Sequence, residues 1–286
     1  MTSPPPLSIS QIATLACVLE ATAPKVGNVH RGADFEDLTL PDFLVSAIAV
    51  GPILENAAAA GVGRTVLNAI TATRQLVTTN TNLGMVLLLA PLAAMPRGEP
   101  LTIDSVHRVL SSLTPDDSRL VYEAIRLAQP GGLGKVEEMD VAAAPPDDLL
   151  AAMHAAANRD LVARQYAEDF CLVLGEVLPL LQAGRAQGWS LTEAIVHTQV
   201  SLLADHDDSL IARKCGPEVA RQASAIAGQV LACGGPGDEA YYEALADFDF
   251  WLRSDGHRRN PGTTADLIAA ALFAGLREGL LMPPWR

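Results

Sequence analysis

The sequence predicts an all-α protein, built as a single bundle-like domain of about ten or more helices. Apolar residues recur at the three- and four-residue spacing of a buried helix face, as in Val162, Tyr166, Phe170 and Leu174. Alanine and leucine fill such segments, and the alternating β-branched runs typical of strands are nearly absent. With 286 residues, 49% of them apolar, the chain can bury a large core.

The periodic segments predict the helices in order along the chain. They span residues 8–21, 41–60, 64–76, 83–95, 103–112, 116–128, 161–181, 190–204, 217–232, 238–254 and 264–280. Residues 142–148, with Pro145-Pro146, are the best linker candidate, but helical patterns on both sides favour one core. We therefore expect residues 1–286 to form one domain, with residues 1–7 as a flexible tail.

The composition of the chain argues against several classes of function. There are 33 acidic and 20 basic side chains, a net charge of −13, which argues against a general nucleic-acid binder. The four cysteines form no C-x-x-C pair, which favours a reducing cytoplasm over a zinc site or a disulfide framework. Residues 1–6 lack the features of a signal peptide, and the longest apolar stretch, Leu83–Met95, falls short of the roughly 20 residues that span a bilayer. A soluble cytoplasmic protein is expected, with a homodimer possible.

Five polar segments interrupt the helical pattern and carry the functional candidates. They cover residues 23–34, 78–84, 130–140, 205–216 and 257–266. The only three lysines of the chain, Lys25, Lys135 and Lys214, all fall in these segments, while arginine supplies the other basic residues. Because lysine is a compact cation suited to phosphate, this placement suggests a phosphate ligand.

The first two segments combine donors with flexible backbone. Lys25, Asn28, His30 and Arg31 surround Gly27 and suit a phosphate chain, although an ordinary loop with solvated charges is the alternative. Residues 78–82 supply five consecutive polar side chains before an apolar helix. Capping needs only one of them, and a helix N-terminus attracts anions.

The last two segments combine charge with helix starts. Three aspartates, Asp205, Asp207 and Asp208, repel one another unless they are solvated or share a cation; with Arg213-Lys214 they suit Mg²⁺ held against phosphates. The alternative is a solvated acidic cap followed by basic residues at a helix end. Residues 257–266 place two arginines before a helix capped by Thr263 or Thr264, which makes either an anion site or only a well-capped helix. Dinucleotide, P-loop, G-x-S-x-G and H-E-x-x-H signatures are absent from the sequence.

Taken in order, these segments resemble the motifs of the triphosphoribosyl-dephospho-CoA synthase family. The P-K-P-G-x-V stretch is matched by residues 24–29, the N-T-x-x-G segment by 80–84, an aspartate-rich stretch ending in basic residues and glycine by 208–216, and S-P-G-x-x-A-D-L by 260–267. The motif sequences N-V-H-R, G-G-L-G-x-V-E-E and N-P-G-T-T-A-D-L look more like those of the archaeal-type branch. The motifs span nearly the whole chain.

The resemblance implies a reaction and a set of site residues. The 2′-hydroxyl of dephospho-CoA would attack C1′ of the ATP ribose, and adenine would leave through an oxocarbenium-like transition state stabilised by carboxylates. Asp34, Asp205 and Asp208 are then catalytic candidates, and Asp205, Asp207 and Asp208 are candidate ligands of the Mg²⁺ expected with ATP. The ATP- and phosphate-binding candidates are Lys25, Asn28, His30, Arg31, Thr79, Asn80, Thr81, Asn82, Gly84, Arg213, Lys214, Arg258, Asn260, Gly262, Thr263 and Thr264.

Three departures from the family pattern leave alternatives open. Asn82-Leu83 stands where typical synthases carry a His-Lys pair, Val26 replaces a proline, and Thr263 replaces a glycine. The first is expected to change the acceptor. A related nucleotide-dependent transferase acting on another cofactor precursor, in one-carbon or pterin cofactor assembly, is therefore one alternative. A non-catalytic nucleotide-binding protein is the other.

Overall fold

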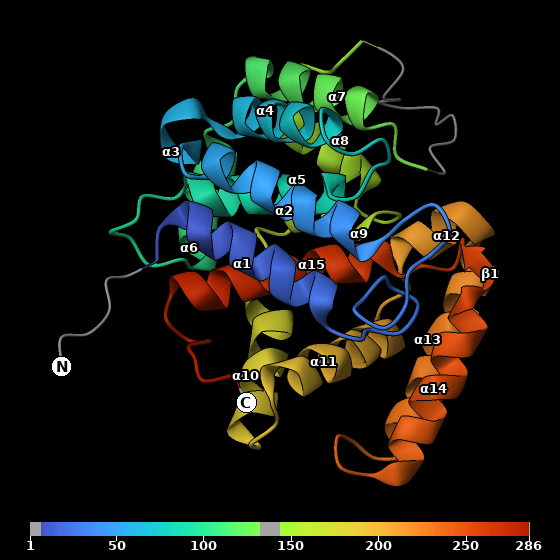
Figure 1. The fold of residues 1–286 in the computed structure, drawn as a ribbon. Coiled ribbons are helices and arrows are strands. Elements are labelled where there is room, and N and C mark those ends of the chain that lie inside the picture. Colours follow the sequence, from blue (N-terminus) through green and yellow to red (C-terminus); the bar gives the residue numbers. More distant parts are fainter. Residues whose placement is uncertain (1–6, 132–143, 286) are drawn as a thin grey trace, which may run out of the picture.

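A computed structural model of the chain describes residues 7–131 and 144–285, and the described part is built almost entirely of helices (Figure 1). The elements are α1 (Ile9–Thr22), α2 (Leu40–Leu54), α3 (Ala57–Ala60), α4 (Val62–Arg74), α5 (Leu83–Ala94), α6 (Ile103–Ser111), α7 (Pro115–Ala128), α8 (Leu149–Ala156), α9 (Leu161–Ala167), the π-helix η1 (Val173–Val177), α10 (Leu178–Ala186), α11 (Leu191–Asp205), α12 (Ser209–Cys215), α13 (Pro217–Ala232), α14 (Glu239–Arg253), the short strand β1 (Ser254–His257) and α15 (Gly262–Arg277). The all-α prediction is confirmed.

Two predicted helices are interrupted, and two short ones were not predicted. The segment 41–60 divides into α2 and α3. The segment 161–181 divides into α9, η1 and α10, because Asp169 and Phe170 adopt positive φ angles of 51° and 62°. Apolar spacing continues through such a break, so periodicity alone predicts one helix. The short helices α8 and α12 follow the linker candidate and the acidic segment.

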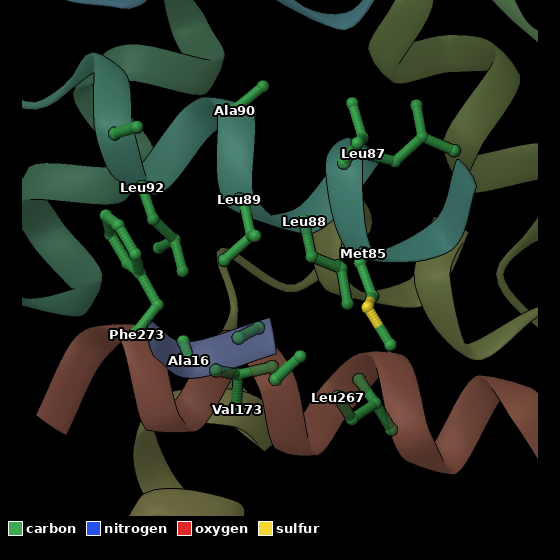
Figure 2. Packing of buried hydrophobic residues seen from close by; sticks show 14 of the residues in the cluster. Ala16, Met85, Leu87, Leu88, Leu89, Ala90, Leu92, Val173, Leu267 and Phe273 are labelled. Atoms are coloured by element: carbon green, nitrogen blue, oxygen red, sulfur yellow. The ribbon is translucent and has the colours of Figure 1, made fainter. Parts of the chain in front are cut away.

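Helix α15 forms the centre of the molecule. Thirteen of its 16 residues are buried, many of them alanines that let neighbouring helices approach closely. Figure 2 shows Leu88 and Leu89 of α5 directed toward the side of α15 that carries Leu267 and Phe273, all buried in one core. Helix α1 packs on another part of α15. The N-terminal end of α15, where residues of the fifth polar segment lie, is therefore fixed by the core.

A smaller apolar cluster is formed by α11, α12, α13 and α14. The first polar segment is attached to it: Val26 is buried there, and Gln199 of α11 accepts from Val26 N at 2.8 Å and donates to Val26 O at 2.9 Å. Gly27 has a φ of 70°, which a side chain would disfavour, and its N–H donates to Asp249. These bonds hold the first loop against α11 and α14 of the smaller cluster. In the described ranges, no helix has the length and apolarity needed to cross a membrane.

Candidate active site

A cavity of about 1830 Å³ lies where the polar segments meet. Residues from all five contribute to its lining, including Gln129, Pro130 and Gly131 near the third, although residues 132–140 of that segment, with Lys135, lie outside the described residues. The predicted site residues that line the cavity are Asn28, Thr79, Asn80, Thr81, Asn82, Gly84, Asp205, Asp207, Arg213, Lys214, Asn260, Gly262 and Thr263. Segments almost 240 residues apart in sequence thus form one site.

The first and last segments are joined directly. Asn28 Nδ2 donates to Asn260 Oδ1 at 2.8 Å, and Gln199 Nε2 donates to Asn28 Oδ1 at 2.8 Å. Both asparagines are more than nine-tenths buried, and both line the cavity. Because their side-chain oxygens are occupied within the protein, they fix the wall of the site.

Lys25 does not line the cavity. Its side chain is fully buried, and Nζ lies 2.8 Å from Glu20 Oε1 and donates to Glu20 O at 2.6 Å. Burial raises the pKa of the Glu20 carboxyl, and the Lys25 charge opposes that rise. The predicted phosphate contact of Lys25 is thus corrected: the ammonium group neutralises a buried acid of α1.

Three other residues of the first segment also lie outside the lining. Arg31 is exposed, and Asp34 Oδ1 accepts from Leu40 N at 2.7 Å, at the start of α2. His30 is partly buried; burial, followed by the nearby Arg253, lowers the pKa of its imidazole. For Asp34 this geometry is a correction, because its carboxylate accepts from the backbone at the start of α2 and is not part of the cavity lining.

The second segment brings the N-terminus of α5 to the cavity. Asn80 Oδ1 accepts from Leu83 N at 3.1 Å, and Thr81 shares a 2.6 Å hydrogen bond with Ser46. Asn82 donates to Thr73 Oγ1 at 3.0 Å, while its own Oδ1 is buried and has no hydrogen-bond partner. A buried acceptor without a partner is costly, so this oxygen is suited to a donor on a ligand.

The three aspartates of the fourth segment divide into two kinds. Asp208 is buried and caps α12: one oxygen accepts from Leu210 N and Ile211 N, and the other from the N–H and hydroxyl of Thr264, at 2.8–3.0 Å. Four accepted hydrogen bonds use the lone pairs of this carboxylate. Its predicted metal and catalytic roles are corrected to a structural one, as is the ligand role of Thr264. Burial raises its pKa despite these bonds.

Asp205 and Asp207 are exposed and line the cavity. Asp205 is the last residue of α11, and Asp207 accepts from Ser224 Oγ at 2.8 Å. Within the described residues, no cluster of three or more His, Cys, Asp or Glu side chains could hold a metal ion. The acidic segment therefore brings two carboxylates to the cavity. A metal ion bound there would need its remaining ligands from a substrate.

Two cations of α12 form part of the cavity wall. Arg213 bonds to Asp160 Oδ2 at 3.2 Å and to Gly131 O at 3.3 Å. The Lys214 ammonium group has no hydrogen bond or ion pair with any described residue, while the Lys214 carbonyl accepts from Arg258. Burial and then the Arg213 charge lower the pKa of the ammonium group. Arg258, also predicted as a phosphate ligand, is exposed outside the lining and pairs with Asp255 at 3.4 Å. Lys214 is thus the cation best placed for an anion.

Asp266 is the main site residue that sequence reasoning missed. It lines the cavity from the second turn of α15, and burial, followed by the charges of Glu20, Asp208 and Asp160, raises its pKa well above the usual range. It lies within the N-P-G-T-T-A-D-L segment, where it resembles an ordinary acid near a helix start. Asp160, Arg159 and Arg74 also line the cavity. They carry no motif signal of their own.

Comparison with known proteins identifies a family whose sequence profile spans all five of these segments. The sequence profile of the CitG family, described as ATP:dephospho-CoA triphosphoribosyl transferase, matches residues 6–283. The chain belongs to the CitG family. The range matched by this transferase family contains all five polar segments and every residue that lines the cavity. No curated protein matches the chain significantly.

A solved structure supports the same family. A protein from Archaeoglobus fulgidus, whose crystal structure carries the provisional description of a triphosphoribosyl-dephospho-CoA synthase, superposes with a TM-score of 0.64 at 25% identity. The match covers 85% of this chain and 100% of the other. This CitG-family chain therefore has the helical architecture of an archaeal relative, in agreement with its archaeal-type motif sequences.

Proposed function

We propose that this CitG-family protein transfers the triphosphoribosyl group of ATP to the 2′-hydroxyl of dephospho-CoA and releases adenine. The observation that carries the proposal is a large cavity lined by the ordered family segments. Sites for one drug-sized ligand measure roughly 300 to 1,000 Å³. A cavity of about 1830 Å³ therefore has room for two nucleotide-sized substrates side by side.

Charge on the cavity wall suits the triphosphate. Lys214 and Arg213 provide cations on α12, and Arg159 and Arg74 line the same cavity. Asp205 and Asp207 fit a Mg²⁺ ion that arrives with ATP, because this metal is usually held by one or two carboxylates together with substrate phosphates. When bound, Mg²⁺ would neutralise phosphate charge, while Lys214 and Arg213 orient the triphosphate.

The transfer itself places positive charge on the ribose. As the bond from C1′ to the adenine nitrogen breaks, the sugar becomes oxocarbenium-like, and carboxylates of a partly buried cavity stabilise it. The N-terminus of α5 and the free Oδ1 of Asn82 provide a donor end and an acceptor for sugar or phosphate groups. The cytoplasmic location and the homodimer stay predictions.

Chromatography of the protein with Mg-ATP and dephospho-CoA tests this function. Free adenine together with a heavier CoA product is the expected result, and chelation of Mg²⁺ by EDTA should abolish both. Adenine without the CoA product would assign the glycosyl chemistry to another acceptor, such as a precursor in one-carbon or pterin cofactor assembly. Binding of ATP without consumption would favour a non-catalytic nucleotide-binding protein.

Replacing Lys214 with methionine is expected to raise KM for ATP about tenfold or more, because a charge-assisted hydrogen bond contributes about 1.5 to 3 kcal/mol. The effect on kcat should be smaller, since the phosphates are distant from C1′. Steady-state kinetics with varied ATP measures both. Arg258→Met is the matched control: this neighbouring cation lies outside the cavity lining and should leave KM unchanged. Equal effects of the two variants would contradict the placement of the triphosphate.

A further inference from the structure

The Asp266 carboxylate occupies space that a glycine leaves open. A Cβ atom on Gly84, near the start of α5, would lie 1.9 Å from Asp266 Oδ2. Gly84 is helical and has no positive φ, so no unusual backbone conformation requires a glycine here. The glycine matters because it has no side chain. The contact brings the carboxyl group of α15 against the N-terminal turn of α5, at the wall of the cavity.

Acidic groups approach Asp266 from three other elements. Glu20 comes from α1, Asp160 caps α9, and Asp208 caps α12. Arg213 is the opposing cation, but it is bonded to Asp160. A carboxyl group in such surroundings holds its proton because ionisation would add a further negative charge to a partly dry region. The pKa is raised first by burial and then by these charges.

Two further titratable groups belong to this environment, and neither forms an ion pair with Asp266. Lys25 is buried against Glu20 and neutralises that acid. The buried thiol of Cys17, with a pKa raised to about 12, stays uncharged. The Asp266 carboxyl group makes no hydrogen bond to any described residue and lines the cavity, so its proton is available to a ligand.

The cavity wall beside α15 is suited to a flat base. Helices α5 and α9 both pack on α15, and they place Leu83, Leu87, Leu161 and Val162 in the lining. All four are more than nine-tenths buried. Apolar side chains with one convergent proton donor are typical of a site for an aromatic ring. The unpaired cation Lys214 lies on α12, which supplies the phosphate side of the cavity.

We propose that Asp266 is the general acid that protonates adenine as it departs, with Gly84 positioning its carboxyl group. The inference rests on the proposed transferase function. The bond from C1′ to the base nitrogen breaks with its electron pair going to adenine, and Asp266 donates its proton to a ring nitrogen of the base. The acceptor oxygen forms the new bond to C1′ and loses its proton to solvent, from which Asp266 is reprotonated.

The decisive experiment compares two leaving groups in the Asp266→Asn variant. With ATP, turnover should fall about 10²- to 10⁴-fold, the usual contribution of a general acid. With N7-methyl-ATP the base leaves neutral without accepting a proton, so the same variant should lose less than about tenfold relative to wild type. Equal losses with both nucleotides, or full turnover with ATP, would overturn the role. Asp104→Asn, which removes an exposed acid from the first turn of α6, is the control.

A pH profile gives an independent readout. A general acid must be protonated, so wild-type kcat with ATP should fall as pH rises through the pKa of Asp266, and the Asn variant should lack that limb. A wild-type rate that instead rises with pH over this range would overturn the acid role. Absence of adenine release by wild type at every pH is a different failure, because it would remove the transferase proposal itself.

Gly84→Ala separates positioning from folding. The added methyl group would displace the carboxyl group, so kcat with ATP should fall at least about tenfold while KM changes little. In the Asp266→Asn background the same change should have almost no further effect on kcat, since there is no acid left to displace. Additive losses in this double-mutant cycle would overturn the contact. Thermal melting should show Asp266→Asn at least as stable as wild type, because it removes an acid from acidic surroundings.

Discussion

Replacing Lys25 with methionine is expected to lower the free energy of unfolding by about 3 to 5 kcal/mol, the cost of leaving one member of a buried ion pair uncompensated. Glu20 would stay buried and would lose the ammonium group 2.8 Å away, which compensates its charge. Urea denaturation followed by circular dichroism measures the loss. Both side chains of the pair are buried, so moderate salt should change the result little.

Two variants make the Lys25 result specific. Arg31→Met removes an exposed cation from the same loop and should change stability by less than about 0.5 kcal/mol. The double variant Glu20→Leu/Lys25→Met should recover most of the loss, because a buried pair replaced by apolar side chains is often neutral. A Lys25→Met protein with wild-type stability and a greatly raised KM for ATP would instead restore the phosphate role predicted from the sequence.

Asp208→Ala is the second large effect, expected at about 2 to 4 kcal/mol of unfolding free energy. Alanine would remove the cap of α12 and leave the Thr264 N–H and hydroxyl without an acceptor inside the protein. Equilibrium denaturation again provides the measurement. Asp205→Ala, an exposed acid of the same segment, should cost less than about 0.5 kcal/mol. An Asp208→Ala protein of normal stability without turnover would return this residue to the catalytic set.

The helical fold was predictable because burial imposes a spacing on the sequence. Most segments with the 3.6-residue pattern, such as α11 and α13, begin and end within two residues of the predicted bounds. The break after α9 was not predictable, since the apolar spacing continues through Asp169 and Phe170 and gives no local signal of their positive φ angles. The four-residue α3 and the seven-residue α12 are too short for periodicity to separate from their surroundings.

The position of the site was easier to predict than the role of each residue in it. Polar segments that interrupt apolar helices lie at helix ends, and here they meet around the cavity. Whether Lys25 faces ligand or Glu20 depends on how the end of α1 packs, and no local pattern contains that information. Asp266 shows the reverse case: its closeness to Gly84, about 180 residues earlier in the chain, exists only in the folded protein.

Helix α15 has two tasks that constrain its evolution. The same 16 residues fill the centre of the core and carry Thr263 and Asp266 at the cavity, so a change there alters stability and chemistry together. The α8 side of the cavity is less constrained, because several residues between Ala156 and Asp160 are partly or fully exposed. New acceptor preferences would therefore arise most readily by substitution near α8, while α15 retains the common step of removing the base.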